Sequence, residues 1–147
     1  MRASAEPIDG PYHEFLSYLA ARHRINLHSG SALELSGDEM FNTSVVFGRS
    51  GEVLAKYRKM HRFDVTMPNG VSHLESSIFG GGTEVVTANV DGVTVGLTIC
   101  YDLRFPALFD RLREKGAEII VVPSAFQLLT GVDHWEVLLR ARAIETQ

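Results

Sequence analysis

The stretch 93–109, VTVGLTICYDLRFPALF, contains the only cysteine of the chain, at the point where a strand pattern changes to a helix pattern. Apolar residues alternate with small or polar ones up to Ile99, which is typical of a half-buried strand, and 105–112 carries apolar residues at helical spacing. Cys100 lies at this junction. A nucleophile there would be held by a rigid strand, close to backbone N–H groups, and would point out from the sheet edge. Cys100 is therefore a candidate reactive residue.

Two other interpretations of Cys100 stay open. An isolated cysteine in an apolar strand is more often a small buried core residue than a reactive one. Cys100 is the last residue of the strand and precedes the charged turn YDLR, and this position makes the core interpretation weaker than it is for a cysteine inside a strand. A redox-sensing thiol is the second alternative.

The composition indicates one globular domain. The 147 residues are 45% hydrophobic and 22% charged, which is enough apolar material for a substantial core. Lys and Arg number 14 against 18 Asp and Glu, so the net charge is −4, and basic residues are scattered apart from a short cluster over 56–62. This distribution predicts no nucleic-acid partner.

The sequence also suggests a cytoplasmic protein without a metal. One cysteine cannot form an internal disulfide, residues 1–10 lack the apolar core of a signal peptide, and no apolar run has membrane-spanning length. The six histidines lack paired spacing, and there is no second cysteine to complete a ligand set. We therefore expect no membrane association, no metal and no cofactor.

Hydrophobic periodicity predicts an α/β fold. Helices are expected over 12–23, from near 105 to 115, and over 134–144. Strands are expected over 25–33, 41–47, 53–57, 83–90, 93–99 and 119–122. Glycine-containing turns at 48–52 and at Asp91-Gly92 predict two hairpins, Asp9 is a candidate cap for the first helix, and the apolar run 119–122 is expected to be buried on both faces.

The segment 58–82 reads as a long irregular loop, a kind of loop that is often functional. It includes Pro68, Asn69 and a glycine triplet. Lys59 enters it in AKYRKMHRFD, where an ammonium could stabilise an oxyanion. Glu75 follows within HLES. By residue type alone, each is more often a solvated surface residue.

Taken in order, the motifs YRKMHRFD, ES, GLTICYDLRFP and HWEVLLRARAIETQ resemble the carbon–nitrogen hydrolase (nitrilase) superfamily over essentially the whole chain. The last two most resemble its Nit branch, the deaminated-glutathione amidase and ω-amidase group. The resemblance implies an α-β-β-α sandwich that dimerises, a small-molecule amide substrate and no cofactor.

The same resemblance implies a set of site residues. Cys100 matches the nucleophile, Lys59 the lysine that stabilises the tetrahedral intermediate, and Glu75 the second glutamate. The N–H of Tyr101 matches an oxyanion donor. Asp102 and Arg104 are expected to hold the strand-to-helix turn at Cys100, called the elbow below, by hydrogen bonds. The residues expected to line the pocket are Ser124, Ala125 and Phe126.

One element of the family pattern has no match. The first glutamate, the general base, belongs to an N-terminal strand–helix unit ending in an FPE-like motif, and Glu6, Glu14 and Glu34 do not stand in such a motif. Both ends read as cut, so residues 1–147 are interpreted as an incomplete domain, a partial α-β-β-α sandwich. We expect an amidase forming a thioester on Cys100, with little activity in this chain alone. The alternative is a non-catalytic pseudoenzyme that keeps the fold for dimerisation or binding.

Overall fold

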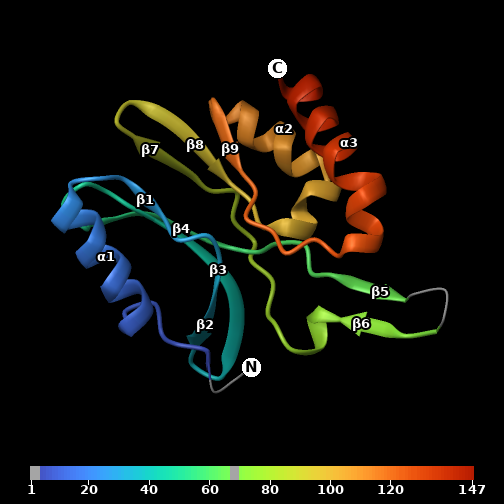
Figure 1. Cartoon of the computed structure of the whole chain (residues 1–147), viewed down its shortest axis with the longest axis horizontal. Helices are drawn as coiled ribbons and strands as arrows, with labels where there is room; N and C mark the ends of the chain where they lie inside the picture. The colour runs from blue at the N-terminus through green and yellow to red at the C-terminus, as the bar shows by residue number, and fades with distance from the viewer. Residues whose placement is uncertain (1–3, 67–69) are drawn as a thin grey trace.

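The computed structural model describes residues 4–66 and 70–147. Pro68 and Asn69, part of the expected irregular segment, lie outside the described residues. The described chain forms four layers in the order helix, sheet, sheet, helix pair (Figure 1). This is the α-β-β-α arrangement that the family resemblance implies.

The first sheet is built around its longest strand, β3. Its strands are β1 (Leu27–His28), β2 (Ala32–Ser36), β3 (Glu39–Phe47) and β4 (Val53–Arg58). Both β2 and β4 pair antiparallel with β3, and the β3–β4 hairpin predicted at 48–52 is confirmed. The single strand expected over 25–33 is wrong, because the chain is interrupted around Gly30, whose φ is 71°.

The second sheet joins a hairpin to a parallel crossover. Its strands are β7 (Thr87–Val90), β8 (Val93–Leu97) and β9 (Ile119–Val121). The hairpin turn at Asp91-Gly92 is confirmed, and both residues have positive φ, at 52° and 91°, as a tight hairpin turn requires. After the elbow and a helix, β9 returns parallel to β8.

The last strand is less buried than its sequence predicts. Ile119 is 52% exposed, and Ile120 and Val121 are only partly buried. Among the described residues β9 pairs with β8 on one edge only. The apolar run correctly predicted a strand, but the prediction that it is buried on both faces is wrong. Burial also depends on the neighbouring strands and layers, which the local sequence does not specify.

The helices lie on the two outer faces. They are α1 (Pro11–His23), α2 (Pro106–Glu114) and α3 (Leu128–Thr146). Pro11 occupies the first turn of α1, where its missing N–H costs nothing. The predicted Asp9 cap is wrong, since Gly10 is the N-cap residue and the carboxylate of Glu6, not that of Asp9, accepts the N–H of Tyr12 in the first turn at 2.8 Å. The start of α3 was also placed too late at residue 134.

The segment 58–82 contains more regular structure than expected. A short antiparallel pair, β5 (Asp64–Thr66) with β6 (Ser72–Leu74), is followed by the 3-10 turn η2 (Glu75–Ser77). Strands of three residues are too short for period-two alternation to be recognised in a sequence. The pair extends away from the sheets in Figure 1.

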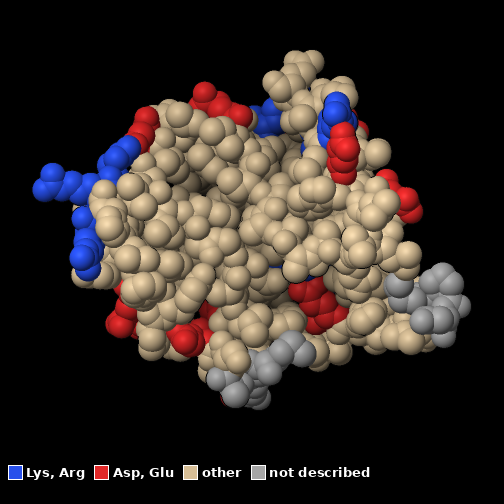
Figure 2. Space-filling model, in the orientation of Figure 1, with Lys and Arg blue, Asp and Glu red and all other residues tan. Residues whose placement is uncertain are grey.

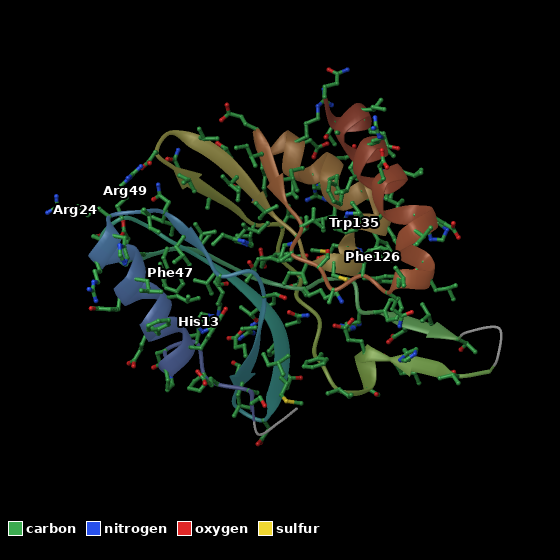
Figure 3. All side chains as sticks on the ribbon, in the orientation of Figure 1. His13, Arg24, Phe47, Arg49, Phe126 and Trp135 are labelled. Atoms are coloured by element: carbon green, nitrogen blue, oxygen red, sulfur yellow. The ribbon has the colours of Figure 1, made fainter. Side chains whose placement is uncertain are left out.

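The core consists of three apolar clusters. Ala20 of α1 packs against Val45 and Phe47 of β3, and the Phe47 and His13 ring centroids lie 6.3 Å apart (Figure 3). The cluster between the sheets is formed by Val46, Tyr57, Ala88, Leu97 and Ile99. The cluster beneath α2 and α3 is formed by Leu103, Leu108, Phe109 and Leu112. Ile99 belongs to the cluster between the sheets and Leu103 to the cluster beneath α2 and α3, so residues 99–103 connect these two clusters and fix the position of Cys100.

No helix within residues 4–66 and 70–147 combines the length and hydropathy needed to cross a membrane.

Candidate active site

Cys100 lies in a strained backbone conformation at the predicted junction. It is the first residue of the 3-10 helix η3 (Cys100–Arg104), which precedes α2, and its φ is 49°. For a residue other than glycine this left-handed region costs about 1–2 kcal/mol. The N–H of Cys100 donates to the carbonyl oxygen of Pro123 at 2.9 Å. Strain of this kind persists where surrounding contacts impose it, and it is common at nucleophiles on strand-to-helix turns.

Cys100 opens onto a small cavity of about 150 Å³. Tyr101, Ala125 and Phe126, three residues expected at the site, also line it. Figure 3 shows Phe126 beside Trp135 of α3, and the two ring centroids lie 5.0 Å apart. The remaining lining residues are Phe63, Arg104, Gln127 and Thr130.

Lys59 and Glu75 form an ion pair that is connected to this cavity through Phe63, and neither is among its lining residues. Lys59 Nζ lies 2.6 Å from Glu75 Oε2, and the lysine side chain is 4% exposed. The same carboxylate oxygen accepts the N–H of Phe63 at 2.5 Å, and Phe63 lines the cavity. Interpretation of Lys59 as a solvated surface residue is therefore wrong. The structure thus joins the buried Lys59 ammonium to Glu75, and joins Glu75 to the cavity-lining residue Phe63.

Asp102 holds the elbow, as expected, through a fully buried carboxylate. Its Oδ2 accepts the N–H of Ile99 at 2.9 Å and the hydroxyl of Tyr57 at 2.7 Å. Its Oδ1 accepts the backbone N–H of His61 at 2.9 Å and lies 2.8 Å from His61 Nδ1. Because a carboxylate can only accept here, we assign the ring proton to Nδ1.

The surroundings keep the Tyr57 phenol neutral. Burial raises its pKa far above the ordinary value of 10, and the charge and hydrogen bond of Asp102 act in the same direction. Tyr57 is therefore a permanent donor to Asp102 at any physiological pH.

Two expected residues lie differently from prediction. Arg104 lines the cavity rather than bracing the elbow: its Nη2 lies 3.2 Å from His134 Nδ1, and its guanidinium lies 5.3 Å from the Phe126 ring centroid. Ser124 is exposed, its hydroxyl donates to the carbonyl of Val122 at 3.1 Å, and it is not part of the cavity lining among the described residues.

Sequence reasoning missed five residues around Cys100. Phe63, Gln127 and Thr130 line the cavity, while Tyr57 and His61 bind Asp102. Phe63 and His61 stand inside RKMHRFD, so reading that motif beyond its lysine could have found them. Gln127 and Thr130 carry no such signal.

Glu34 is buried but does not lie in the cavity lining. Burial alone would raise its pKa, but hydrogen bonds from Arg58 and Thr43, with the charges of Lys56 and Arg58, together lower it to about 2. Such a carboxylate is a weak base, in agreement with leaving the general-base role unassigned. In the described part of the chain, no three His, Cys, Asp or Glu side chains are grouped so that they could hold a metal ion.

The sequence pattern that defines the carbon–nitrogen hydrolase family matches residues 1–147, and the chain belongs to this family. It is 41% identical over 143 residues to human omega-amidase NIT2, covering 97% of this chain and 52% of that protein. It is 42% identical over 143 residues to the deaminated glutathione amidase of Yersinia enterocolitica, covering 95% and 50%. The chain thus spans about half the length of these relatives.

Solved structures agree with this placement. Saccharomyces cerevisiae Nit3, a member of branch 10 of the nitrilase superfamily, superposes with a TM-score of 0.84 at 34% identity, over 98% of this chain and 51% of that one. A glutamate-to-glutamine mutant of the amidase from Nesterenkonia sp. AN1, 28% identical with a TM-score of 0.75 over 91% of this chain and 50% of that one, shows the result of Michael addition of acrylamide at its active-site cysteine. The chain therefore lies in the Nit branch of the nitrilase superfamily.

Proposed function

We propose that this chain carries the nucleophile and oxyanion-stabilising part of a cysteine amidase, which converts a small carboxamide to a carboxylic acid and ammonia. The observation that carries the proposal is the position of Cys100, strained at φ 49° and opening onto a cavity whose wall includes Phe63, the residue bonded to Glu75 of the Lys59–Glu75 pair. The activities of the amidase relatives support the same chemistry.

In this mechanism the thiolate of Cys100 attacks the amide carbon. Negative charge develops on the former carbonyl oxygen, where the Lys59 ammonium and the Tyr101 N–H stabilise it; one such donor typically contributes about 3–4 kcal/mol to lowering the barrier. The tetrahedral intermediate collapses as its nitrogen takes up the proton that the thiol gave up, so that ammonia leaves and a thioester remains on Sγ. Water, deprotonated by a carboxylate base, then releases the acid and restores the thiol.

The polypeptide of these 147 residues is proposed to turn over slowly at best. Glu75 already accepts hydrogen bonds from Lys59 and Phe63, and Glu34 is held by Arg58, so neither is a free general base. A general base typically contributes a factor of about 10²–10⁴ in rate. We further propose a cytoplasmic location, a dimer in the functional protein, and a single incomplete domain over 1–147.

The test is covalent capture of Cys100 by acrylamide, an electrophile that carries a carboxamide. We expect stoichiometric modification of Cys100, seen by intact mass and peptide mapping, at a rate well above that of glutathione under the same conditions. Cys100→Ser should abolish it, and ammonia release from simple amides should stay near background. A rate equal to that of glutathione would contradict an amide-binding site at Cys100.

The second candidate function is a non-catalytic module that keeps the fold for association. The face in Figure 2 is largely free of charged side chains, which lie mainly near its rim. The large apolar side chains of α3 that are at least 65% exposed are Leu128, Leu129, Val132, Val137 and Ile144. An assembly in solution with no acrylamide capture would favour this function.

A further inference from the structure

One buried carboxylate contacts both segments that supply the proposed catalytic residues. Oδ2 of Asp102 accepts from Ile99, the residue before Cys100, and from Tyr57, two residues before Lys59. Oδ1 accepts twice from His61, two residues after Lys59. The nucleophile segment and the ammonium segment therefore share a single anchor, although they are about forty residues apart in sequence.

On the nucleophile side, the carboxylate closes the turn that contains Cys100. Asp102 reaches back three residues to the Ile99 N–H, so Cys100 and Tyr101 lie inside a loop fixed at both ends. The strained φ of 49° at Cys100 needs such a constraint, because an unconstrained residue would relax out of the left-handed region.

On the ammonium side, the chain turns around the same carboxylate. The N–H of Met60 donates to the Tyr57 hydroxyl at 3.2 Å, and the next N–H, that of His61, donates to Asp102. The backbone of Lys59 is also fixed by hydrogen bonds. Its N–H donates to the carbonyl oxygen of Asn42 at 2.8 Å, and its carbonyl oxygen accepts the N–H of Gly82 at 2.9 Å.

The groups around Asp102 call for two acceptor oxygens. Each oxygen of Asp102 accepts two hydrogen bonds, one of them from a backbone N–H that cannot turn away. An asparagine offers one acceptor oxygen and an NH₂ group, so in either orientation its NH₂ would face a backbone donor.

We propose that Asp102 is a positioning residue that sets the Cys100 thiol relative to the Lys59 ammonium, with Tyr57 and His61 as its partners. The inference deepens the proposed amidase function and rests on it for the chemical consequence. Displacement of a reacting group by about 1 Å can cost a factor of about 10² in rate. The shared anchor is therefore expected to matter for amide recognition beyond its effect on stability.

The experiment compares Asp102→Asn with Thr43→Val in the 147-residue chain. Thr43 is also buried and donates to a buried carboxylate, Oε2 of Glu34 at 2.6 Å, but it contacts neither candidate catalytic segment through that bond. The first readout is the ratio of two alkylation rate constants at Cys100, with acrylamide and with methyl vinyl sulfone, which lacks the carboxamide. Both reagents consume the same thiolate, so the ratio is independent of the thiolate fraction.

The expected result is a fall of about tenfold or more in this ratio for Asp102→Asn and a change within about twofold for Thr43→Val. Tyr57→Phe removes one donor and keeps the carboxylate, so it should lower the ratio less, and it serves if Asp102→Asn does not fold. An unchanged ratio in both Asp102→Asn and Tyr57→Phe would overturn the proposal. An equal fall of the ratio in Thr43→Val would also overturn it.

The second readout is hydrogen–deuterium exchange of peptides covering 59–63 and 99–103. Loss of the shared anchor in Asp102→Asn or Tyr57→Phe should speed exchange in both segments. In Thr43→Val, exchange in both segments should stay as in the unmodified chain. A response of one segment alone, or of neither, would refute the positioning role. This readout still decides the matter if the unmodified chain alkylates no faster than glutathione, a result that would count against the proposed amidase function instead.

Discussion

Two buried carboxylates in this chain are compensated in opposite ways. Glu34 of β2 is 2% exposed and faces two cations, Arg58 and Lys56, with Thr43 as a further donor. Asp102 is fully buried and faces two backbone N–H groups, a phenol and an imidazole. Long cationic side chains can follow a displaced carboxylate, whereas backbone donors cannot. We conclude that Glu34 mainly balances charge, while Asp102 mainly fixes geometry.

The largest effect is expected for Asp102→Ala. It leaves four donors without their acceptor in a buried site, at about 1–3 kcal/mol for each group that finds no new partner. We expect a loss of about 4 kcal/mol or more in the free energy of unfolding, measured by urea denaturation and circular dichroism. A loss below about 1 kcal/mol would show that water or rearrangement replaces the carboxylate, and would remove the basis of the comparison.

Glu34 should be recognised by its pH dependence. Its pKa is lowered to about 2 in the folded chain, from an ordinary 4.5, so its stabilising contribution is present above about pH 5 and is lost as the pH falls toward 2. The shift corresponds to roughly 3 kcal/mol. The difference in unfolding free energy between the unmodified chain and Glu34→Gln should therefore shrink by about that amount between pH 6 and pH 2. A difference that stays constant over this range would contradict charge balance by Glu34.

Replacement of Cys100 measures the strain that the elbow imposes. Glycine adopts φ near 49° without the steric cost that alanine meets there, and this outweighs its greater freedom in the unfolded chain. Cys100→Gly should be more stable than Cys100→Ala by about 1 kcal/mol, measured in parallel urea titrations. Equal stability of the two variants would indicate that the turn relaxes when the cysteine is removed.

The smallest effect is expected for an exposed ion pair, which serves as the reference for the two buried carboxylates. Arg140 Nε lies 2.8 Å from Glu136 Oε1, one helical turn away, and both side chains are about three-quarters exposed. Solvent and salt screen such pairs. Glu136→Gln should leave the urea midpoint unchanged within error, and a clear shift would mean that burial is not what separates Glu34 and Asp102 from surface charges.

The sequence allowed prediction of much of the fold because its signals are local. The Asp91-Gly92 turn, the apolar spacing of α1 and the run 119–122 each indicated an element that is present. Burial of Ile119 was not predictable, since it depends on what lies beside β9. The three-residue strands β5 and β6 were too short to be recognised.

Prediction of the site was limited for a different reason. The roles of Lys59 and Glu75 came from resemblance to a family, because a separation of 16 residues says nothing about whether two side chains meet. Their ion pair, and the meeting of Tyr57 and His61 at Asp102, depend on how distant segments come together. No periodicity in the sequence encodes such convergence.

The distance along the chain between the partners of Asp102 also affects folding. Tyr57 and Asp102 are 45 residues apart, whereas the β3–β4 and β7–β8 hairpins close over a few residues. Closing long loops costs entropy that only later contacts return, so local hairpins are expected to form earlier. A nascent or partly folded chain would then carry an ordinary thiol, and Cys100 would acquire its strained, anchored geometry only when the two sheets had met.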